Sequence, residues 1–276
     1  MIAYDQRAMA KIAQPVARPS MYRGCLPGTA VAVLVRERST NASASALARE
    51  LELPLVQRAD STQFRYLLVP SPQGLQLCDS RNPRVRPLSV NASWLVTQVG
   101  IISRRQPLAR AVGRRARTVV DVTAGFGDDA LLLAAIGYRV TAIERCPIIG
   151  VLLRDGIMRA RADSRLASLL DQRLSLVIGE AREVLPGLDP VPDTIYMDPM
   201  FPPKRKRSAL TRKSARVLRE LVGDDEDAPR LLELCLRQAN QRVVVKRPHY
   251  AAPLLAKPSL SCSGKLVRYD VYLTGG

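Results

Sequence analysis

A carboxylate stands at the end of a predicted buried strand, directly before a rigid turn. Residues 195–197 are apolar, Asp198 follows them, and the next residues are Pro199, Met200 and Phe201. In an open α/β sheet, ligands bind outside the carboxyl ends of the strands. The segment therefore places an acid, a turn of low conformational freedom and an aromatic ring where a reaction would occur.

The residue types of this segment suit the binding of an amine on an aromatic base. An aryl amine is a weak nucleophile because its lone pair is delocalised into the ring. Asp198 and the Pro199 carbonyl could accept its two N–H bonds, orient the lone pair and stabilise the charge that develops on transfer. Phe201 could stack on the base, a contact worth ~1–3 kcal/mol. The segment resembles the Asp/Asn-Pro-Pro-Tyr/Phe motif of methyltransferases that act on exocyclic amines, with Met200 replacing the second proline. We predict that Asp198, Pro199 and Phe201 are catalytic.

A second motif, residues 121–127, predicts a cofactor site. Asp121 and Thr123 precede two glycines, Gly125 and Gly127, between a predicted strand (118–122) and a predicted helix (128–136). Glycines allow a sharp turn and a close approach of the backbone to a ligand, and the helix adds a positive N-terminal end. The glycine spacing also matches the dinucleotide fingerprint. The acid and the threonine before the glycines favour S-adenosylmethionine.

Glu144 follows the next predicted strand, at the spacing that one helix sets. A carboxylate in this position can accept hydrogen bonds from both ribose hydroxyls of a nucleoside cofactor. A surface ion pair with the neighbouring Arg145 is the alternative, and the position after a strand favours the ligand role.

The charge balance favours a polyanionic partner. The chain has 42 Lys and Arg against 25 Asp and Glu, a net charge of +17, and such residues neutralise phosphates. The excess is clustered: six arginines and no acid lie between residues 104 and 117. We expect an RNA-facing surface there. Around the proposed base pocket and at the end of the strand over 242–246, the predicted RNA-binding residues are Lys204, Arg205, Lys206, Arg207, Arg212, Lys213, Lys246 and Arg247.

The order of the predicted elements indicates an α/β fold. Residues 1–28 read as an N-terminal extension that is poorly ordered, 29–90 as a small α+β domain and 91–117 as a basic connector. From residue 118 strands alternate with helices to the end of the chain, which is typical of a largely parallel sheet with right-handed crossovers. The five cysteines show no metal-ligand spacing, no apolar run is long enough to span a membrane, and no signal peptide is recognised. We therefore expect no metal and a cytoplasmic protein.

Four segments together resemble one family. They are Asp-Val-Thr-Ala-Gly-Phe-Gly (121–127), Glu-Arg (144–145), Tyr-Met-Asp-Pro-Met-Phe-Pro (196–202) and Val-Val-Val-Lys-Arg-Pro with a following Tyr (243–250). They are similar to the RsmJ family, the bacterial small-subunit ribosomal RNA guanine-N2 methyltransferases, over roughly residues 29–276. The resemblance implies a Rossmann-like class I S-adenosylmethionine-dependent methyltransferase domain, with ribosomal RNA or the small ribosomal subunit as partner. It also implies cofactor contacts at Asp128, Asp129, Glu144, Arg145, Glu180, Ala181 and Asp198.

Three other functions fit parts of the sequence. One is an amine methyltransferase acting on another base, such as adenine in DNA. The second is a catalytically silent RNA-binding protein on the same scaffold, and the third is a nicotinamide-dependent oxidoreductase. The sequence does not indicate which guanine is modified or the oligomeric state.

Overall fold

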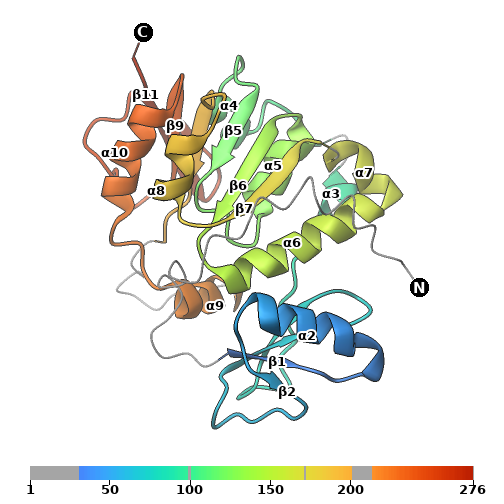
Figure 1. The fold of residues 1–276 in the computed structure, drawn as a ribbon. Coiled ribbons are helices and arrows are strands. Elements are labelled where there is room, and N and C mark those ends of the chain that lie inside the picture. The colour runs from blue at the N-terminus through green and yellow to red at the C-terminus, as the bar shows by residue number, and fades with distance from the viewer. Residues whose placement is uncertain (1–30, 99–100, 171, 201–212, 276) are drawn as a thin grey trace.

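A mixed seven-stranded sheet forms the centre of the molecule (Figure 1). The computed structural model describes residues 31–98, 101–170, 172–200 and 213–275. Within them the order of this sheet is β10-β11-β9-β8-β5-β6-β7. The strand bounds are β5 Thr118–Asp121, β6 Arg139–Glu144, β7 Leu174–Ile178, β8 Thr194–Met197, β9 Arg242–Pro248, β10 Leu260–Ser263 and β11 Val267–Leu273.

Strand order reverses between β5 and β8. From β5 the chain adds β6 and β7 on one side, and then β8 and β9 on the other, all of them parallel to β5. Only β11 runs antiparallel to its neighbours β9 and β10. Ligands of open α/β sheets bind at such a switch point, outside the carboxyl ends of the strands. Both predicted motifs lie there, because residues 121–127 follow β5 and Asp198 follows β8.

Alternate residues of the central strands enter two separate hydrophobic clusters, one on each face. Val119, Val140 and Tyr196 pack on the side that helices α4 to α7 cover, whereas Val120, Ile143 and Ile195 pack on the side of α8 and α10. This alternation follows from the two-residue period of a strand. The helices are α4 Pro107–Val112, α5 Asp128–Ile136, α6 Pro147–Ala162, α7 Ser164–Leu170, α8 Ala181–Val184 and α10 Ala228–Gln238.

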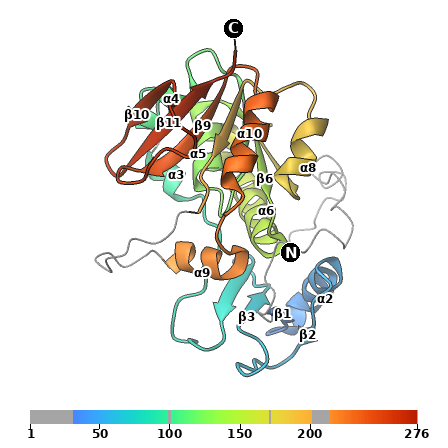
Figure 2. The same cartoon turned by 90° about the vertical axis from the view of Figure 1, so that its left-hand side faces the viewer.

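A smaller four-stranded sheet precedes the large one. Its order is β2-β1-β3-β4, with β1 Val31–Leu34, β2 Leu55–Val56, β3 Tyr66–Val69 and β4 Gln76–Asp79, and helix α2 Asn41–Glu50 packs on it. Both views place α9, Lys213–Val222, between this small sheet and the carboxyl end of the large sheet (Figures 1 and 2). Arg65 and the Tyr66 hydroxyl bond the α9 residue Glu220. The small sheet is thus tied to a helix that follows the segment carrying Asp198.

The predicted strands and long helices of residues 118–275 are present, with ends that differ by at most two residues where the structure describes them, and the fold is the expected Rossmann-like class. The predicted helix over 208–222 is described only from Lys213 onward. Sequence reasoning missed α7, α8, and two helices inside the basic connector, α3 Trp94–Gln98 and α4. Four residues of α4 are buried, so its arginine-rich surroundings hid a core element: Leu108, Ala109, Ala111 and Val112. The extension 1–28 lies outside the described residues, and the domain boundaries stay a prediction.

No helix of the described residues is long and apolar enough to cross a membrane. The same residues contain no cluster of three or more His, Cys, Asp or Glu that could hold a metal ion.

Candidate active site

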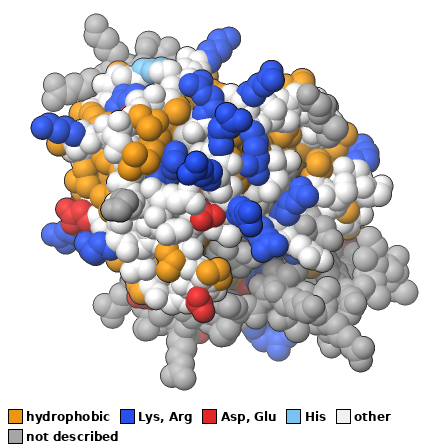
Figure 3. Space-filling view, turned by 90° about the horizontal axis from the view of Figure 1, so that it is seen from above, with side chains coloured by type: hydrophobic (Ala, Val, Ile, Leu, Met, Phe, Trp, Pro, Cys, Tyr) orange, Lys and Arg blue, Asp and Glu red, His pale blue; other side chains and the backbone are white. Residues whose placement is uncertain are grey.

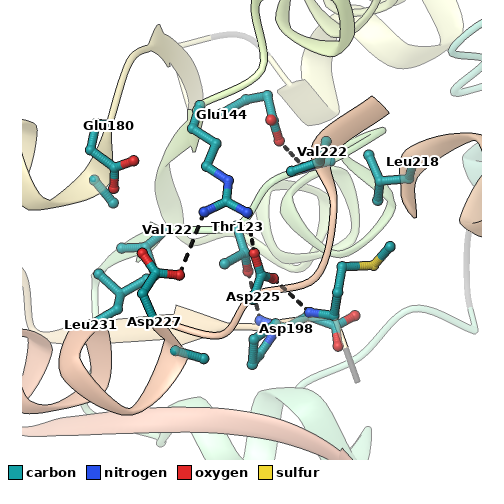
Figure 4. A pocket seen from close by; sticks show the side chains of 16 residues that line it. Val122, Thr123, Glu144, Glu180, Asp198, Leu218, Val222, Asp225, Asp227 and Leu231 are labelled. Atoms are coloured by element: carbon teal, nitrogen blue, oxygen red, sulfur yellow. Dashed lines mark hydrogen bonds and ion pairs between the residues drawn. The ribbon is translucent and has the colours of Figure 1, made fainter. Parts of the chain in front are cut away.

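A pocket of about 570 Å³, open solvent at its mouth included, lies at the carboxyl ends of β5, β6, β7 and β8. Its floor carries the predicted residues Thr123, Gly125, Glu144 and Asp198 (Figure 4). The remaining lining residues are Val122, Arg145, Glu180, Ala181, Pro199, Met200, Leu218, Val222, Asp225, Asp227, Ala228 and Leu231.

The Glu144 carboxylate is fixed by two backbone amides. Its Oε2 accepts the Gly125 N–H at 2.7 Å, and its Oε1 accepts the Cys146 N–H at 2.7 Å. A carboxylate has about four lone-pair sites, so each oxygen can accept one further hydrogen bond. Burial raises the pKa of Glu144 to about 7, although both amides and Arg145 act in the opposite direction. The carboxylate is therefore held in one orientation with acceptor capacity left for a ligand.

Thr123 joins the glycine turn to the catalytic motif. Its Oγ1 accepts the backbone N–H of Asp198 at 2.6 Å, while its own N–H donates to Asp121 Oδ1 at 3.1 Å. Asp121 is buried at the end of β5, and burial raises its pKa well above the usual value. Asp121 thus shapes the turn from behind the pocket, and Thr123 fixes the start of the segment that carries Asp198.

Lys246 connects Asp198 with Asp129. Its Nζ lies 2.9 Å from Asp198 Oδ2 and donates to Asp129 Oδ2 at 2.7 Å, and that Asp129 oxygen also accepts the Tyr196 hydroxyl at 2.6 Å. Desolvation by the surrounding protein raises the pKa of Asp198 to about 6; Lys246 opposes this shift and Asp129 adds to it. The two carboxylates raise the pKa of Lys246 against the effect of burial. At neutral pH the group is an ionised Asp198 beside a charged lysine.

The acidic segment between α9 and α10 closes one side of the pocket. Arg145 pairs with Asp225, and lies 3.6 Å from Asp227, whose Oδ2 also accepts Arg182 at 2.9 Å. Asp225 Oδ2 accepts the Met200 N–H at 2.6 Å (Figure 4). Asp225 therefore links Arg145, which follows Glu144, to the turn that carries Pro199 and Met200. Sequence reasoning missed Asp225 and Asp227, although four consecutive acids at residues 224–227 in so basic a chain were a usable signal.

The structure brings together seven of the eleven predicted cofactor residues in the pocket lining. Four others lie near it but do not line it: Asp121, Gly127, Asp128 and Asp129. Phe201 and the basic residues Lys204, Arg205, Lys206, Arg207 and Arg212 lie outside the described residues, and Lys213 begins α9.

The two predicted RNA contacts at the end of β9 are engaged within the protein. Lys246 is held by its two carboxylates, and Arg247, which is 9% exposed, donates to the Ala252 carbonyl from Nε at 3.0 Å. Lys246 therefore forms one ionic group with Asp198 and Asp129, and its predicted contact with RNA stays a prediction, as does that of Arg247.

The strand order and an acid-lined pocket at its switch point define a Rossmann-like S-adenosylmethionine-dependent methyltransferase. The model of the family described as "Putative SAM-dependent methyltransferase" matches residues 47–274. A solved SAM-dependent methyltransferase from Neisseria gonorrhoeae is similar with a TM-score of 0.69 and 30% identity, over 88% of this chain and 96% of that one.

Two curated relatives narrow the assignment. A ribosomal RNA small subunit methyltransferase J from Thioalkalivibrio sulfidiphilus is 44% identical over 90% of this chain and 99% of its own length. One of the same name from Coxiella burnetii is 43% identical over 83% and 91%. The chain belongs to the ribosomal RNA small subunit methyltransferase J family.

Proposed function

We propose that this protein transfers a methyl group from S-adenosylmethionine to the exocyclic N2 amine of a guanine in small-subunit ribosomal RNA, in the cytoplasm. The observation that carries the proposal is the convergence of two motifs on one pocket. Glu144 and the glycine turn line one part of it, and Asp198 and Pro199 line another. The relatives' name supplies the class of RNA.

The residues of the pocket fit the cofactor. Glu144 keeps one acceptor site on each oxygen for the two ribose hydroxyls,. The flat, largely apolar adenine suits the wall of Ala181, Ala228 and Leu231, with the Glu180 carboxylate as an acceptor for its amine. Gly125 has φ +55°, a conformation that L side chains rarely adopt, and leaves the backbone open to the ligand,. When bound, S-adenosylmethionine supplies an electrophilic methyl group on a positively charged sulfur.

The residues of the catalytic turn hold the acceptor amine. Asp198 Oδ2 faces Lys246, and no donor among the described residues bonds Oδ1, so Oδ1 and the Pro199 carbonyl can accept the two N–H bonds of the amine. The carboxylate stabilises the positive charge that forms on the nitrogen as its bond to the methyl carbon is made. The departing proton then passes to Asp198 or to water. Phe201, outside the described residues, is our candidate for stacking on the base.

The test is nucleoside analysis of RNA treated with the purified protein. Small-subunit ribosomal RNA, free and assembled, from a strain that lacks the gene is incubated with S-adenosylmethionine, digested and examined by mass spectrometry. We expect one additional N2-methylguanosine per RNA, and a loss of at least about 100-fold in rate for Asp198→Ala. A methyl group on another base, or a fully active Asp198→Ala protein, would refute the assignment.

A further inference from the structure

A group of arginines, four of them exposed and one half-buried, lies at the end of the large sheet opposite the pocket. The C-terminus after β11 is at the top of Figure 1, and β11 is antiparallel to β9. The parallel strands therefore begin at the top, and the view from above in Figure 3 shows Lys and Arg side chains gathered on this face, with few acids. We call Arg114, Arg115, Arg117, Arg139 and Arg173 the arginine edge.

The sheet itself brings three of these residues together. Arg117 precedes β5, Arg139 begins β6, and Arg173 precedes β7. The Arg139 N–H donates to the Arg117 carbonyl at 2.9 Å, and the Val140 N–H donates to the Arg173 carbonyl at 2.7 Å. Neighbouring strands lie about 4.8 Å apart, so the starts of consecutive strands bring a row of arginines to this end of the sheet. This row unites residues that are far apart in the sequence.

The loop that carries Arg114 and Arg115 is held in place by contacts of its own. The Arg104 guanidinium lies 4.8 Å from the centre of the Tyr138 ring, and its Nη1 donates to the Arg114 carbonyl at 3.1 Å. Asp193, an acid at this end of the sheet, accepts the backbone N–H groups of Arg117 at 2.7 Å and Thr118 at 3.0 Å. Its carboxylate thus fixes the backbone and leaves the arginine side chains to the solvent.

Among the residues that the structure describes, no acid pairs with the arginine edge. In residues 31–98, 101–170, 172–200 and 213–275, no carboxylate lies within 4.0 Å of any of its five guanidinium groups. At the pocket end, by contrast, arginines are paired, as Arg145 and Arg182 are. Such a row of unpaired guanidinium groups suits phosphates, which arginine binds through two parallel hydrogen bonds.

We propose that the arginine edge binds the phosphate backbone of the RNA at a second site, remote from the pocket. The inference rests on the proposed RNA substrate and deepens it. Among the described residues, the only exposed large aromatic is Tyr250, which follows β9 at the opposite end of the sheet. With no ring for a base to stack on, contacts at the edge are to the backbone and independent of sequence. An RNA that reaches both ends must extend over the whole domain, as a folded RNA can and a short strand cannot.

Four substitutions at the edge test the proposal directly: Arg114→Gln, Arg115→Gln, Arg117→Gln and Arg139→Gln, combined in one protein. We expect the Kd for folded small-subunit ribosomal RNA to rise by at least about tenfold, and the plot of log K against log salt to become less steep by about two to three. The kcat at saturating RNA and the affinity for S-adenosylhomocysteine should stay at their wild-type values.

A matched control removes four exposed arginines beside the small sheet, with Arg36→Gln, Arg58→Gln, Arg81→Gln and Arg84→Gln. An equal loss of RNA affinity in this control would show that only net charge matters and would overturn the proposal. Unchanged RNA affinity and salt dependence in the edge variant would also overturn it, and would point to an acidic protein as the partner of the edge. Binding is measured without methyl transfer, so a wild-type protein that binds RNA through the edge but adds no methyl group would refute only the proposed activity.

Discussion

The two ends of the large sheet treat charge in opposite ways. At the carboxyl end, acids and bases are held together, as in the Lys246 pairs with Asp129 and Asp198 and the Arg145 pairs with Asp225 and Asp227. At the amino end, the five guanidinium groups of the arginine edge have no carboxylate within 4.0 Å among the described residues. The excess of basic residues comes from the sequence, and the order of the strands determines which of them lie near acids and which do not.

The difference follows from what each end has to bind. A small cofactor and a single base need fixed acceptors, and internal pairs hold those acceptors in one geometry. A long polyanion needs many exposed cations, and internal acids would weaken each of them. The same parallel strands position both the acceptors of the pocket and the arginines of the edge. The loops at their carboxyl ends meet at the switch point, whereas their amino ends lie side by side along the sheet.

The largest effect is expected when the fixed acceptor at the carboxyl end is removed. Glu144→Gln replaces a carboxylate that accepts hydrogen bonds from two backbone N–H groups. The NH2 group of the glutamine would face either one of these N–H groups or a ribose hydroxyl, and neither arrangement restores the lost acceptor. We expect a loss of about 3 kcal/mol, or roughly 100-fold, in affinity for S-adenosylhomocysteine. Isothermal titration calorimetry measures it.

The pH dependence of the same titration separates charge from shape. Because the pKa of Glu144 is raised to about 7, affinity in the wild type should be complete above pH 7 and fall as the pH drops through that value. Glu144→Gln should show no such fall, and the exposed Glu233→Gln on α10 should behave as the wild type. Calorimetry that finds equal affinities for wild type and Glu144→Gln excludes Glu144 as a cofactor ligand.

A smaller effect is expected when Lys246, the cation beside Asp198 at the carboxyl end of the sheet, is replaced. Asp198 acts in its ionised form, so the rate should fall as the pH drops through about 6. In Lys246→Met the ammonium that opposes this raised pKa is lost, and the midpoint should move upward by about one unit, which is tenfold in rate on the acid side. The measurement is kcat against pH with saturating RNA.

Two variants show whether the position of the charge matters. Lys246→Arg keeps a cation and should keep most of the wild-type profile. Lys265→Met removes a cation from the turn between β10 and β11, which does not line the pocket. An unshifted profile in Lys246→Met would mean that the lysine only fills space.

Most of the large sheet and of its cofactor motif could be predicted from the sequence, because periodicity and turn residues are local signals. Glu144 was predictable from its place after a strand. Asp225 was not, since it acts through Met200 and Arg145, which only the folded chain brings to it. The same limit hid α4, in which two of the four buried residues are alanines next to an arginine. It also hid the ion pairs of Lys246 and the row formed by Arg117, Arg139 and Arg173. Both depend on which strands lie next to each other in the folded sheet.

The smallest effect is expected on the stability of the protein, at the two glycines that precede and follow α5. Gly127, at the carboxyl end, has φ +83°, and an added Cβ would lie 2.4 Å from Cδ1 of the buried Leu153. Gly137, at the amino end, has φ +110° with nothing within 4 Å of an added Cβ. Gly137→Ala should therefore cost only the backbone strain of a left-handed residue, about 1 kcal/mol. Gly127→Ala adds overpacking, and should lower the free energy of unfolding by about 1 kcal/mol more. Urea unfolding of both variants tests this, and equal losses would mean that Leu153 moves aside freely and that the packing around the cofactor turn is no tighter than at the open end.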